Sequence, residues 1–280
     1  MSHPASASRS LSQAMLTSLS TAGPHSLHPL PSNILLSPAP TPPLDNIDAL
    51  IDQTRGSLSS NNATVSEVVA ATILLHSLTD PHSTATHLTL PRPLLPAAFK
   101  ASYRKLKALN QLLANTPGNT LCGAILSAMK DTYRLSLLMD ANFGTGLSDH
   151  ERLESSVTLL QDTFSKSLND RTEFVISDTE SPLSATGSKK ALVLSVVNYL
   201  FASYFKLNTL RLCKNVQRPV EARKLHSAVN NVGGKAAMLT YRYYTGRLGM
   251  FEDEYGMAEE GLSYAYVWQE LSHRRGNNLQ

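Results

Sequence analysis

Apolar residues recur at intervals of three and four along most of the chain from about residue 44 onward. This spacing places side chains on one face of an α-helix, and the plainest case is the series Leu153, Val157, Leu160, Phe164 and Leu168. Strict alternation of apolar and polar residues, the signal of a half-buried strand, is nearly absent. The pattern predicts an all-α protein built of successive helical hairpins. Helices are expected over about residues 64–79, 97–114, 120–141, 148–168, 188–214 and 220–230, with a helix pair over 241–268.

The helix pair Tyr241–Trp268 organises the C-terminal part of the chain. Its first half has one apolar face, a charged turn follows at Glu252–Glu254, and its second half is apolar on two faces. A helix with two apolar faces has neighbours on both sides. Small residues stand where two antiparallel helices would approach closely, in part of the tetratricopeptide spacing; a plain helical bundle would explain the same pattern. The residues predicted to pack this hairpin are Tyr244, Gly246, Phe251, Ala258, Leu262 and Ala265.

Local signals mark where several helices begin and end. Thr64 with Glu67, and Ser148 with Glu151, have the spacing of capping boxes, which satisfy free N–H groups at helix starts. From Ser188 to Lys214 the helical pattern is uninterrupted, which predicts one helix of roughly 40 Å. The segment from Asn215 to Pro219 is expected to close it.

Three regions follow from composition. Residues 1–43 are rich in Ser, Pro and His and cannot bury enough apolar surface to offset the loss of chain entropy, so a disordered tail is expected. Residues 44–186 are expected to form N-terminal helical repeats and 187–280 a second helical domain, separated by a polar connection.

Charge and cysteine usage narrow the class of protein. The 280 residues carry a formal net charge of +3, and 17% are charged. Cys122 and Cys213 are isolated in apolar helical patterns, so they indicate core thiols in a reducing compartment, with no disulfide framework and no metal spacing. The most apolar run, Ala191–Phe205, is too short to span a membrane.

Motifs for catalysis are incomplete. The segment around Gly233 and Gly234 resembles a phosphate loop, but that motif requires glycine where this chain has Val229 and Ser or Thr where it has Ala236. His150–Glu151 lacks the second histidine of a zinc protease motif. We therefore predict a non-enzymatic protein with no catalytic residue, metal site, cofactor or small-molecule substrate.

A basic stretch between residues 206 and 247 contains tyrosines and only one acid, Glu221. Cations interleaved with aromatic rings indicate an acidic partner: RNA, DNA or an acidic peptide. The ordinary polar face of stacked helices is an equal alternative. The residues predicted to bind such a partner are Lys206, Arg211, Lys214, Arg218, Arg242 and Arg247.

Two segments resemble a known family. They are VVNYLFASYFKLNTLRLCKNVQR, residues 196–218, and TYRYYTGRLGMFEDEYGMAEEGLSYAYVW, residues 240–268. Together they are similar to the PCI-domain proteins, named for the proteasome lid, the COP9 signalosome and initiation factor three. The resemblance is greatest to the branch that contains the signalosome's twelfth subunit and the PCI protein of the nuclear transcription-and-mRNA-export complex.

This resemblance implies a right-handed stack of helical hairpins followed by a winged helix. The chain reaches Gln280 just after the last hairpin, so we expect the winged helix to be missing. The resemblance further implies a nuclear, and also cytoplasmic, scaffold subunit of a complex that couples transcription to mRNA export. Its partners would be a large export-complex scaffold protein and a small acidic peptide subunit. A COP9-signalosome-associated subunit and a direct RNA- or DNA-binding helical-repeat module are the alternatives.

Overall fold

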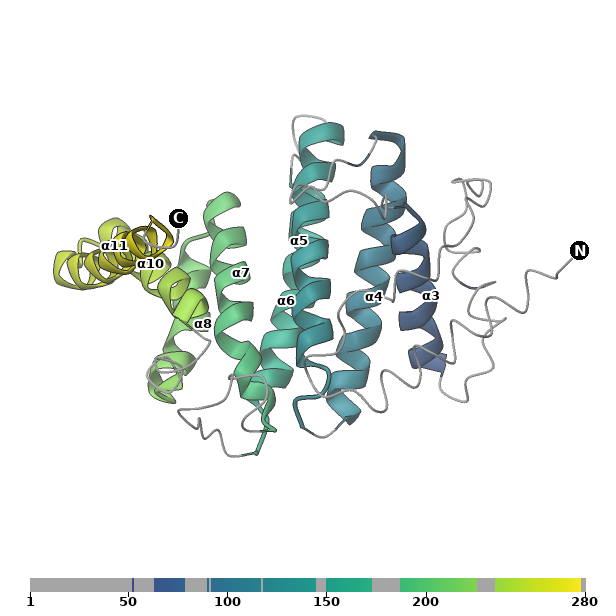
Figure 1. Ribbon diagram of the computed structural model, residues 1–280, viewed down its shortest axis with the longest axis horizontal. Helices are drawn as coiled ribbons and strands as arrows, with labels where there is room; N and C mark the ends of the chain where they lie inside the picture. Colours follow the sequence, from purple (N-terminus) through teal and green to yellow (C-terminus); the bar gives the residue numbers. More distant parts are fainter. Residues whose placement is uncertain are drawn as a thin grey trace, which may run out of the picture. The chain divides into compact units, whose positions relative to one another are not determined.

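All regular structure in the described part of the chain is helical (Figure 1). A computed structural model describes residues 52, 63–78, 90, 92–116, 118–144, 150–172, 187–225 and 235–277, with side chains described as far as Val267. These residues contain eight α-helices, two short 3₁₀ helices and no strand. The predicted all-α fold of successive helical hairpins is confirmed; the right-handed sense of the stack stays a prediction.

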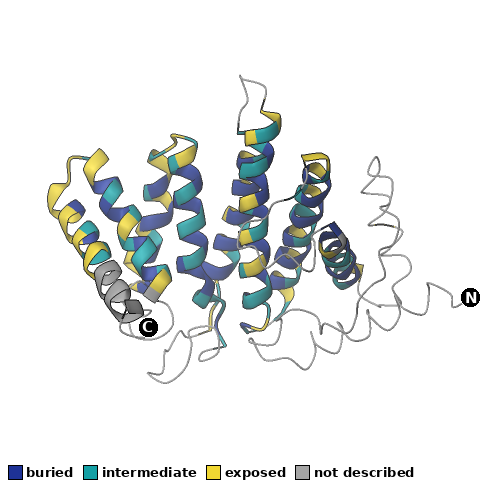
Figure 2. Cartoon of the chain, turned by 45° about the horizontal axis from the view of Figure 1, so that its top comes forward, coloured by how far each residue is buried: buried dark blue, intermediate teal, exposed yellow. Residues whose placement is uncertain are grey.

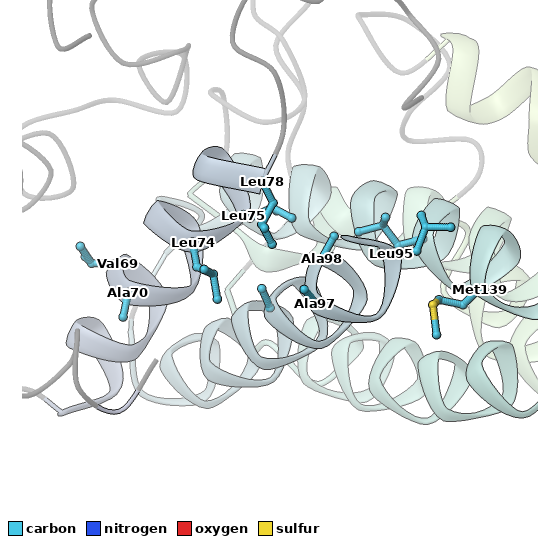
Figure 3. Close-up of a cluster of buried hydrophobic side chains, with 11 residues drawn as sticks. Val69, Ala70, Leu74, Leu75, Leu78, Leu95, Ala97, Ala98 and Met139 are labelled. Carbon is cyan, nitrogen blue, oxygen red and sulfur yellow. The ribbon is translucent and has the colours of Figure 1, made fainter. Parts of the chain in front are cut away.

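The first compact unit extends to Asp162 and has its core where three consecutive helices pack together. These are α3 (Ala63–Leu78), α4 (Leu95–Asn115), which the 3₁₀ helix η2 (Arg92–Leu94) precedes, and α5 (Cys122–Phe143). Helix α4 contacts both of the others, and Figure 3 shows their apolar side chains meeting in one cluster. Its members are Val69, Ala70, Leu74, Leu75, Leu78, Leu95, Ala97, Ala98, Ala101, Leu135 and Met139.

Small side chains and buried hydrogen bonds set how α4 lies against its neighbours. Ala98 and Ala101 are fully buried, so the α4 backbone can approach the adjoining helices closely. The Thr132 hydroxyl of α5 donates to the Ser102 carbonyl of α4 at 3.2 Å. The Asn110 side-chain amide of α4 donates to the Leu159 carbonyl of α6 at 3.0 Å. Each bond satisfies a buried polar group and gives α4 one register against that neighbour.

Helix α6 (Glu151–Leu168) takes its N-terminal cap from another helix. The Asp140 carboxylate, near the end of α5, accepts hydrogen bonds from the backbone N–H of Arg152 at 3.1 Å and of Leu153 at 3.0 Å. A helix start leaves such N–H groups without intrahelical partners. The predicted capping residue Ser148 lies outside the described residues. The predicted apolar stripe of α6 is confirmed, because Leu153, Val157, Leu160, Phe164 and Leu168 are all buried.

The second compact unit begins at Thr163 and contains η3 (Lys189–Leu192), α7 (Val193–Lys206), α8 (Arg211–Ala222), α10 (Lys235–Phe251) and α11 (Tyr255–Asn277). Helix α7 packs against α8 and α10, and α10 packs along α11 (Figure 1). The Asp170 carboxylate accepts from the Ser188 hydroxyl at 3.0 Å and from the Lys189 N–H at 2.7 Å, which holds the start of η3. Most of α7 is buried, as its nearly uniform apolar sequence predicts.

The single helix predicted over Ser188–Lys214 is wrong, because the chain turns sharply after α7. Asn208 adopts a left-handed backbone conformation with φ of 54°. The Thr209 N–H then bonds back to the Tyr204 carbonyl at 2.9 Å, the pattern that commonly ends a helix. Asparagine enters this region more readily than most residues. The long pattern is therefore two helices, α7 and α8, joined by a tight turn.

Pro219 does not close a helix as predicted but lies inside α8. Proline lacks an N–H and removes one intrahelical bond, and α8 ends three residues later at Ala222. The helix predicted over 220–230 is therefore wrong for its first residues, which belong to the end of α8 and the turn after it.

The chain passes from the first compact unit to the second within α6, between Asp162 and Thr163. The predicted division between residues 186 and 187 stays a prediction. Several predicted features lie outside the described residues: the 1–43 tail, the polar connection over 173–186 and the segment 226–234.

Candidate functional site

The hairpin of α10 and α11 is closed by a turn whose backbone geometry is well defined. Asp253 has φ of 59°, and the Glu254 N–H bonds to the Gly249 carbonyl at 2.9 Å. Aspartate tolerates this left-handed conformation. The Tyr255 hydroxyl donates to Asp253 Oδ1 at 2.9 Å. The predicted acidic turn Glu252–Glu254 thus reverses the chain over three residues.

Three glycines let the two helices come into backbone contact. A Cβ placed on Gly261 would lie 2.6 Å from the Arg242 carbonyl oxygen. One on Gly246 would lie 2.9 Å from the Leu262 nitrogen, and one on Gly249 would lie 3.0 Å from the Ala258 nitrogen. Because all of these neighbours are backbone atoms, they cannot rotate away. The sequence pattern predicted a packing role for Gly246 but not for Gly249 or Gly261.

Among the predicted hairpin residues, Ala258 is buried, and Leu262 and Ala265 are half-buried in α11. Tyr244 is also half-buried; its ring lies 6.0 Å from that of Phe201 and 5.5 Å from that of Phe205, both in α7. Tyr244 therefore packs α10 against α7, on the side away from the close approach with α11.

The prediction that Phe251 packs inside the hairpin is wrong. Phe251 is the last residue of α10 and its side chain is 61% exposed, although the apolar periodicity placed it in the hairpin core. Its ring contacts Phe205 of α7 with centroids 6.0 Å apart. A buried stripe ends where the partner helix ends, and here the chain turns immediately after Phe251.

Burial changes the acidity of several groups here. It raises the pKa of Tyr241, whose ring stacks on Phe201, and the nearby Glu221 carboxylate acts in the same direction. Burial likewise raises the pKa of Tyr244. The pKa of the Cys213 thiol rises to about 12 through burial and the Glu252 carboxylate. These groups stay protonated near neutral pH, as core residues do.

Ion pairs and ring contacts divide the six predicted cations into two groups. Lys214 pairs with Glu252 at 3.0 Å, and Arg242 pairs with Glu260 at 3.0 Å and lies over the Tyr264 ring. Arg247 is half-buried against aromatic rings. The exposed members are Lys206, Arg211 and Arg218, and the described residues place no carboxylate in ion-pair contact with them.

Several exposed apolar side chains lie close together in the sequence, on either side of the turn between α10 and α11. Met250, Phe251, Tyr255 and Met257 all have large exposed fractions, and Leu212 at the start of α8 does too. Figure 2 shows exposed residues in yellow along α11, the helix that ends in grey. Gln217 of α8 contacts the Met257 sulfur at 4.0 Å, so α8 reaches the first turn of α11. A group of exposed apolar side chains is typical of surfaces that contact other macromolecules.

Within the described residues, no group of three His, Cys, Asp or Glu side chains is placed to hold a metal ion. Of the helices in the same part of the chain, none combines the length and the apolar composition needed to cross a bilayer.

Comparisons with known proteins show which proteins this chain is similar to. No protein-family model matches the chain. It is 36% identical over 113 residues to the PCI domain-containing protein 2 homolog of Dictyostelium discoideum, a match that covers 40% of this chain and 24% of that protein. It is 37% identical over 92 residues to PCI domain-containing protein 2 of Danio rerio, covering 33% of this chain and 22% of the fish protein.

A third similar protein is the Protein CSN12 homolog of Neurospora crassa, 30% identical over 125 residues that cover 45% of this chain and 25% of that protein. The matches span about a quarter of the length of these relatives. They agree with one another in family and with the all-helical fold. The chain is similar to members of the PCI-domain family, in the branch of PCI domain-containing protein 2 and the CSN12 homologues.

Proposed function

We propose that the chain is a non-enzymatic scaffold subunit of a nuclear complex that couples transcription to mRNA export. The observation that carries this proposal is the similarity to PCI domain-containing protein 2 and its homologues. PCI-domain proteins act as subunits of multiprotein complexes. The partners that follow from the family are a large export-complex scaffold protein and a small acidic peptide subunit, and the location that follows is the nucleus, with a cytoplasmic pool.

The surface of the last hairpin supports a scaffold role. Stacked helical hairpins offer extended surfaces to other macromolecules. Phe251 and Tyr255 flank the α10–α11 turn, with exposed fractions of 61% and 67%. Large aromatic side chains of this kind supply much of the binding energy of protein interfaces. A partner that covers both would remove apolar area from water on either side of the turn.

A COP9-signalosome-associated subunit is the second candidate, because the Neurospora crassa relative is named Protein CSN12 homolog. Both candidates are scaffold subunits, and they differ in the complex with which the chain would purify. The identity of the co-purifying proteins therefore distinguishes them.

The test is affinity purification of the tagged full chain from nuclear extract, with nuclease treatment and mass spectrometry. We expect an export scaffold and mRNA–protein particle components. The double variant Phe251→Ser/Tyr255→Ser should lose them, whereas Phe143→Ser, which changes an exposed aromatic on α5, should keep them. Recovery of the deneddylase core instead would favour the second candidate, and recovery of neither set would refute the scaffold proposal.

A further inference from the structure

One side of α11 packs against α10, and another side carries exposed tyrosines. Ala258 and Gly261 are buried against α10. Tyr255 and Tyr266 lie away from that contact, with exposed fractions of 67% and 68%. They are eleven residues apart in the same helix, which corresponds to about three turns and about 16 Å along the axis. Both rings therefore lie on one side of α11, at two separate points along it.

Polar side chains separate the two tyrosines. Glu259 follows Tyr255 by four residues and Ser263 precedes Tyr266 by three, and residues at these intervals are neighbours on a helix surface. Both are exposed. These four residues, here called the outer row of α11, have an aromatic ring at each end and hydrogen-bonding groups between the rings. Figure 2 shows exposed residues along this helix as far as its grey end.

The charge around the outer row is negative. Residues 250–267 contain five acids and no Lys, Arg or His. Two of the acids are neutralised, because Glu252 pairs with Lys214 and Glu260 pairs with Arg242, each at 3.0 Å. Among the residues whose side chains are described, no cation is in ion-pair contact with Glu259. The outer row therefore combines apolar area with a carboxylate that a partner can neutralise.

We propose that the outer row of α11 is the docking surface for a basic amphipathic helix of a partner protein. Apolar side chains three turns apart on that helix cover Tyr255 and Tyr266, and a Lys or Arg between them pairs with Glu259. The spacings match because both elements are α-helices with the same rise per turn. This inference rests on the scaffold function proposed above and adds the chemistry of the partner at this surface.

Other occupants fit the outer row less well. An extended peptide gains affinity from main-chain hydrogen bonds to a sheet edge, and the surface of a helix has no such row of free N–H and C=O groups. An acidic peptide is repelled by Glu259 and by the acidic turn before α11. In a symmetric pair of copies the same patch faces itself, so Glu259 would face another negatively charged surface.

The test measures the fluorescence anisotropy of three labelled peptides with the purified full chain. Each peptide is about 18 residues long and rich in alanine, so that it forms a helix in water. The basic amphipathic peptide has Leu on one side and Lys beside it, the scrambled peptide has the same composition without an apolar side, and the acidic peptide has Glu in place of Lys. The basic amphipathic peptide should bind most tightly, and its affinity should fall as salt is added.

Variants of the outer row separate apolar contact from charge. Tyr255→Ala and Tyr266→Ala should each weaken binding of the basic amphipathic peptide about 5- to 30-fold, as the loss of an anchor residue does. Tyr243→Ala, which changes an exposed tyrosine of α10, is the matched control and should leave binding unchanged. Glu259→Lys should weaken binding of the basic peptide and strengthen that of the acidic peptide. Glu154→Lys, the same change at an exposed acid of α6, should do neither.

Two further measurements complete the test. Far-UV circular dichroism of every variant checks that the helices persist. Analytical ultracentrifugation gives the oligomeric state of the wild type and of the double variant Tyr255→Ala/Tyr266→Ala. If the wild type is a dimer that the double variant dissociates, the outer row binds a second copy and the proposal is wrong. A monomeric wild type supports a different protein as the partner.

Equal peptide binding by Tyr266→Ala and Tyr243→Ala would overturn the proposal, as would binding of the scrambled or acidic peptide as tightly as the basic one. These outcomes are distinct from failure of the scaffold proposal. If the basic peptide does not bind but Phe251→Ser/Tyr255→Ser still loses the co-purifying proteins, only the inferred chemistry of the partner is wrong. If the peptide binds but neither set of proteins co-purifies, the scaffold proposal is the one refuted.

Discussion

The backbone contact between α10 and α11 predicts opposite effects for two chemically identical substitutions in α11. Gly256 and Gly261 both lie in this helix, and a Cβ on Gly256 would meet nothing within 4 Å. Replacing glycine by alanine in a helix is favourable by up to about 1 kcal/mol because alanine loses less conformational freedom. Gly256→Ala should therefore raise the free energy of unfolding by a few tenths of a kcal/mol to about 1 kcal/mol.

Gly261→Ala gains the same preference but meets three backbone atoms. Its Cβ would lie 2.6 Å from the Arg242 carbonyl oxygen and 2.9 Å from both the Cα and the nitrogen of Gly246. Backbone cannot rotate away, so the helices must separate, and overpacking of this kind costs about 1–3 kcal/mol. The net change is a loss of up to about 2 kcal/mol. Because helix preference is common to both variants, the difference between them isolates the overpacking.

The assay is equilibrium unfolding in urea, followed by circular dichroism and by tryptophan fluorescence. Trp268 is the only tryptophan of the chain, and its backbone belongs to α11. We expect the unfolding midpoint to rise for Gly256→Ala and to fall for Gly261→Ala, with unchanged slopes. If Gly261→Ala stabilises the hairpin as much as Gly256→Ala does, the two backbones are not in contact and the argument fails.

Three other predictions test separate features. Hydrogen bonds from Lys189, Thr172 and Ser188 outweigh burial and lower the pKa of Asp170, so Asp170→Ala should cost about 1 kcal/mol at pH 7. Because the pKa of Asp170 is lowered in the folded state, its carboxylate stabilises the fold at pH values above the unfolded-state pKa near 3.9, and this stabilisation is lost as the pH falls. The difference in free energy of unfolding between wild type and variant should therefore narrow below about pH 4, and a difference independent of pH would contradict this. Asn208→Val should lower the stability measured by thermal unfolding by about 1–2 kcal/mol, because a β-branched residue is strained at φ of 54°. Asn208→Gly should be neutral or stabilising. An equal loss of stability in both variants would show that the Asn208 side chain matters and not its backbone conformation. Cys122 and Cys213 are buried, and burial raises the pKa of Cys213 to about 12. A thiol reagent at about pH 8 should therefore react with neither cysteine in the native chain and with both in urea. Rapid labelling of the native chain would show that one of the two thiols is accessible.

The helices themselves could be predicted because their apolar spacing is regular. The α6 stripe is the best example, since each of its five predicted residues is buried. The break at Asn208 could not be predicted in the same way, because a polar residue at one exposed position of an apolar helix is ordinary. Only the backbone shows that Asn208 has left the helical conformation.

The candidate site was predictable in composition but not in arrangement. The cations and tyrosines are visible in the sequence, yet the pairing of Lys214 with Glu252 joins residues from different helices and leaves no local signal. Periodicity assigns Phe251 to a face of α10 but says nothing about where the covering helix stops, so its exposure was missed.

The cap that Asp140 provides to α6 has a consequence for the order of folding. A helix whose first N–H groups are satisfied by its own neighbouring residues can nucleate alone, but the first turn of α6 depends on a carboxylate from the end of α5. The end of α5 therefore stabilises the first turn of α6 once the two helices are in contact. An excised peptide covering α6 should fray at its start, and cooperativity in this unit should arise from such borrowed caps as well as from the apolar core.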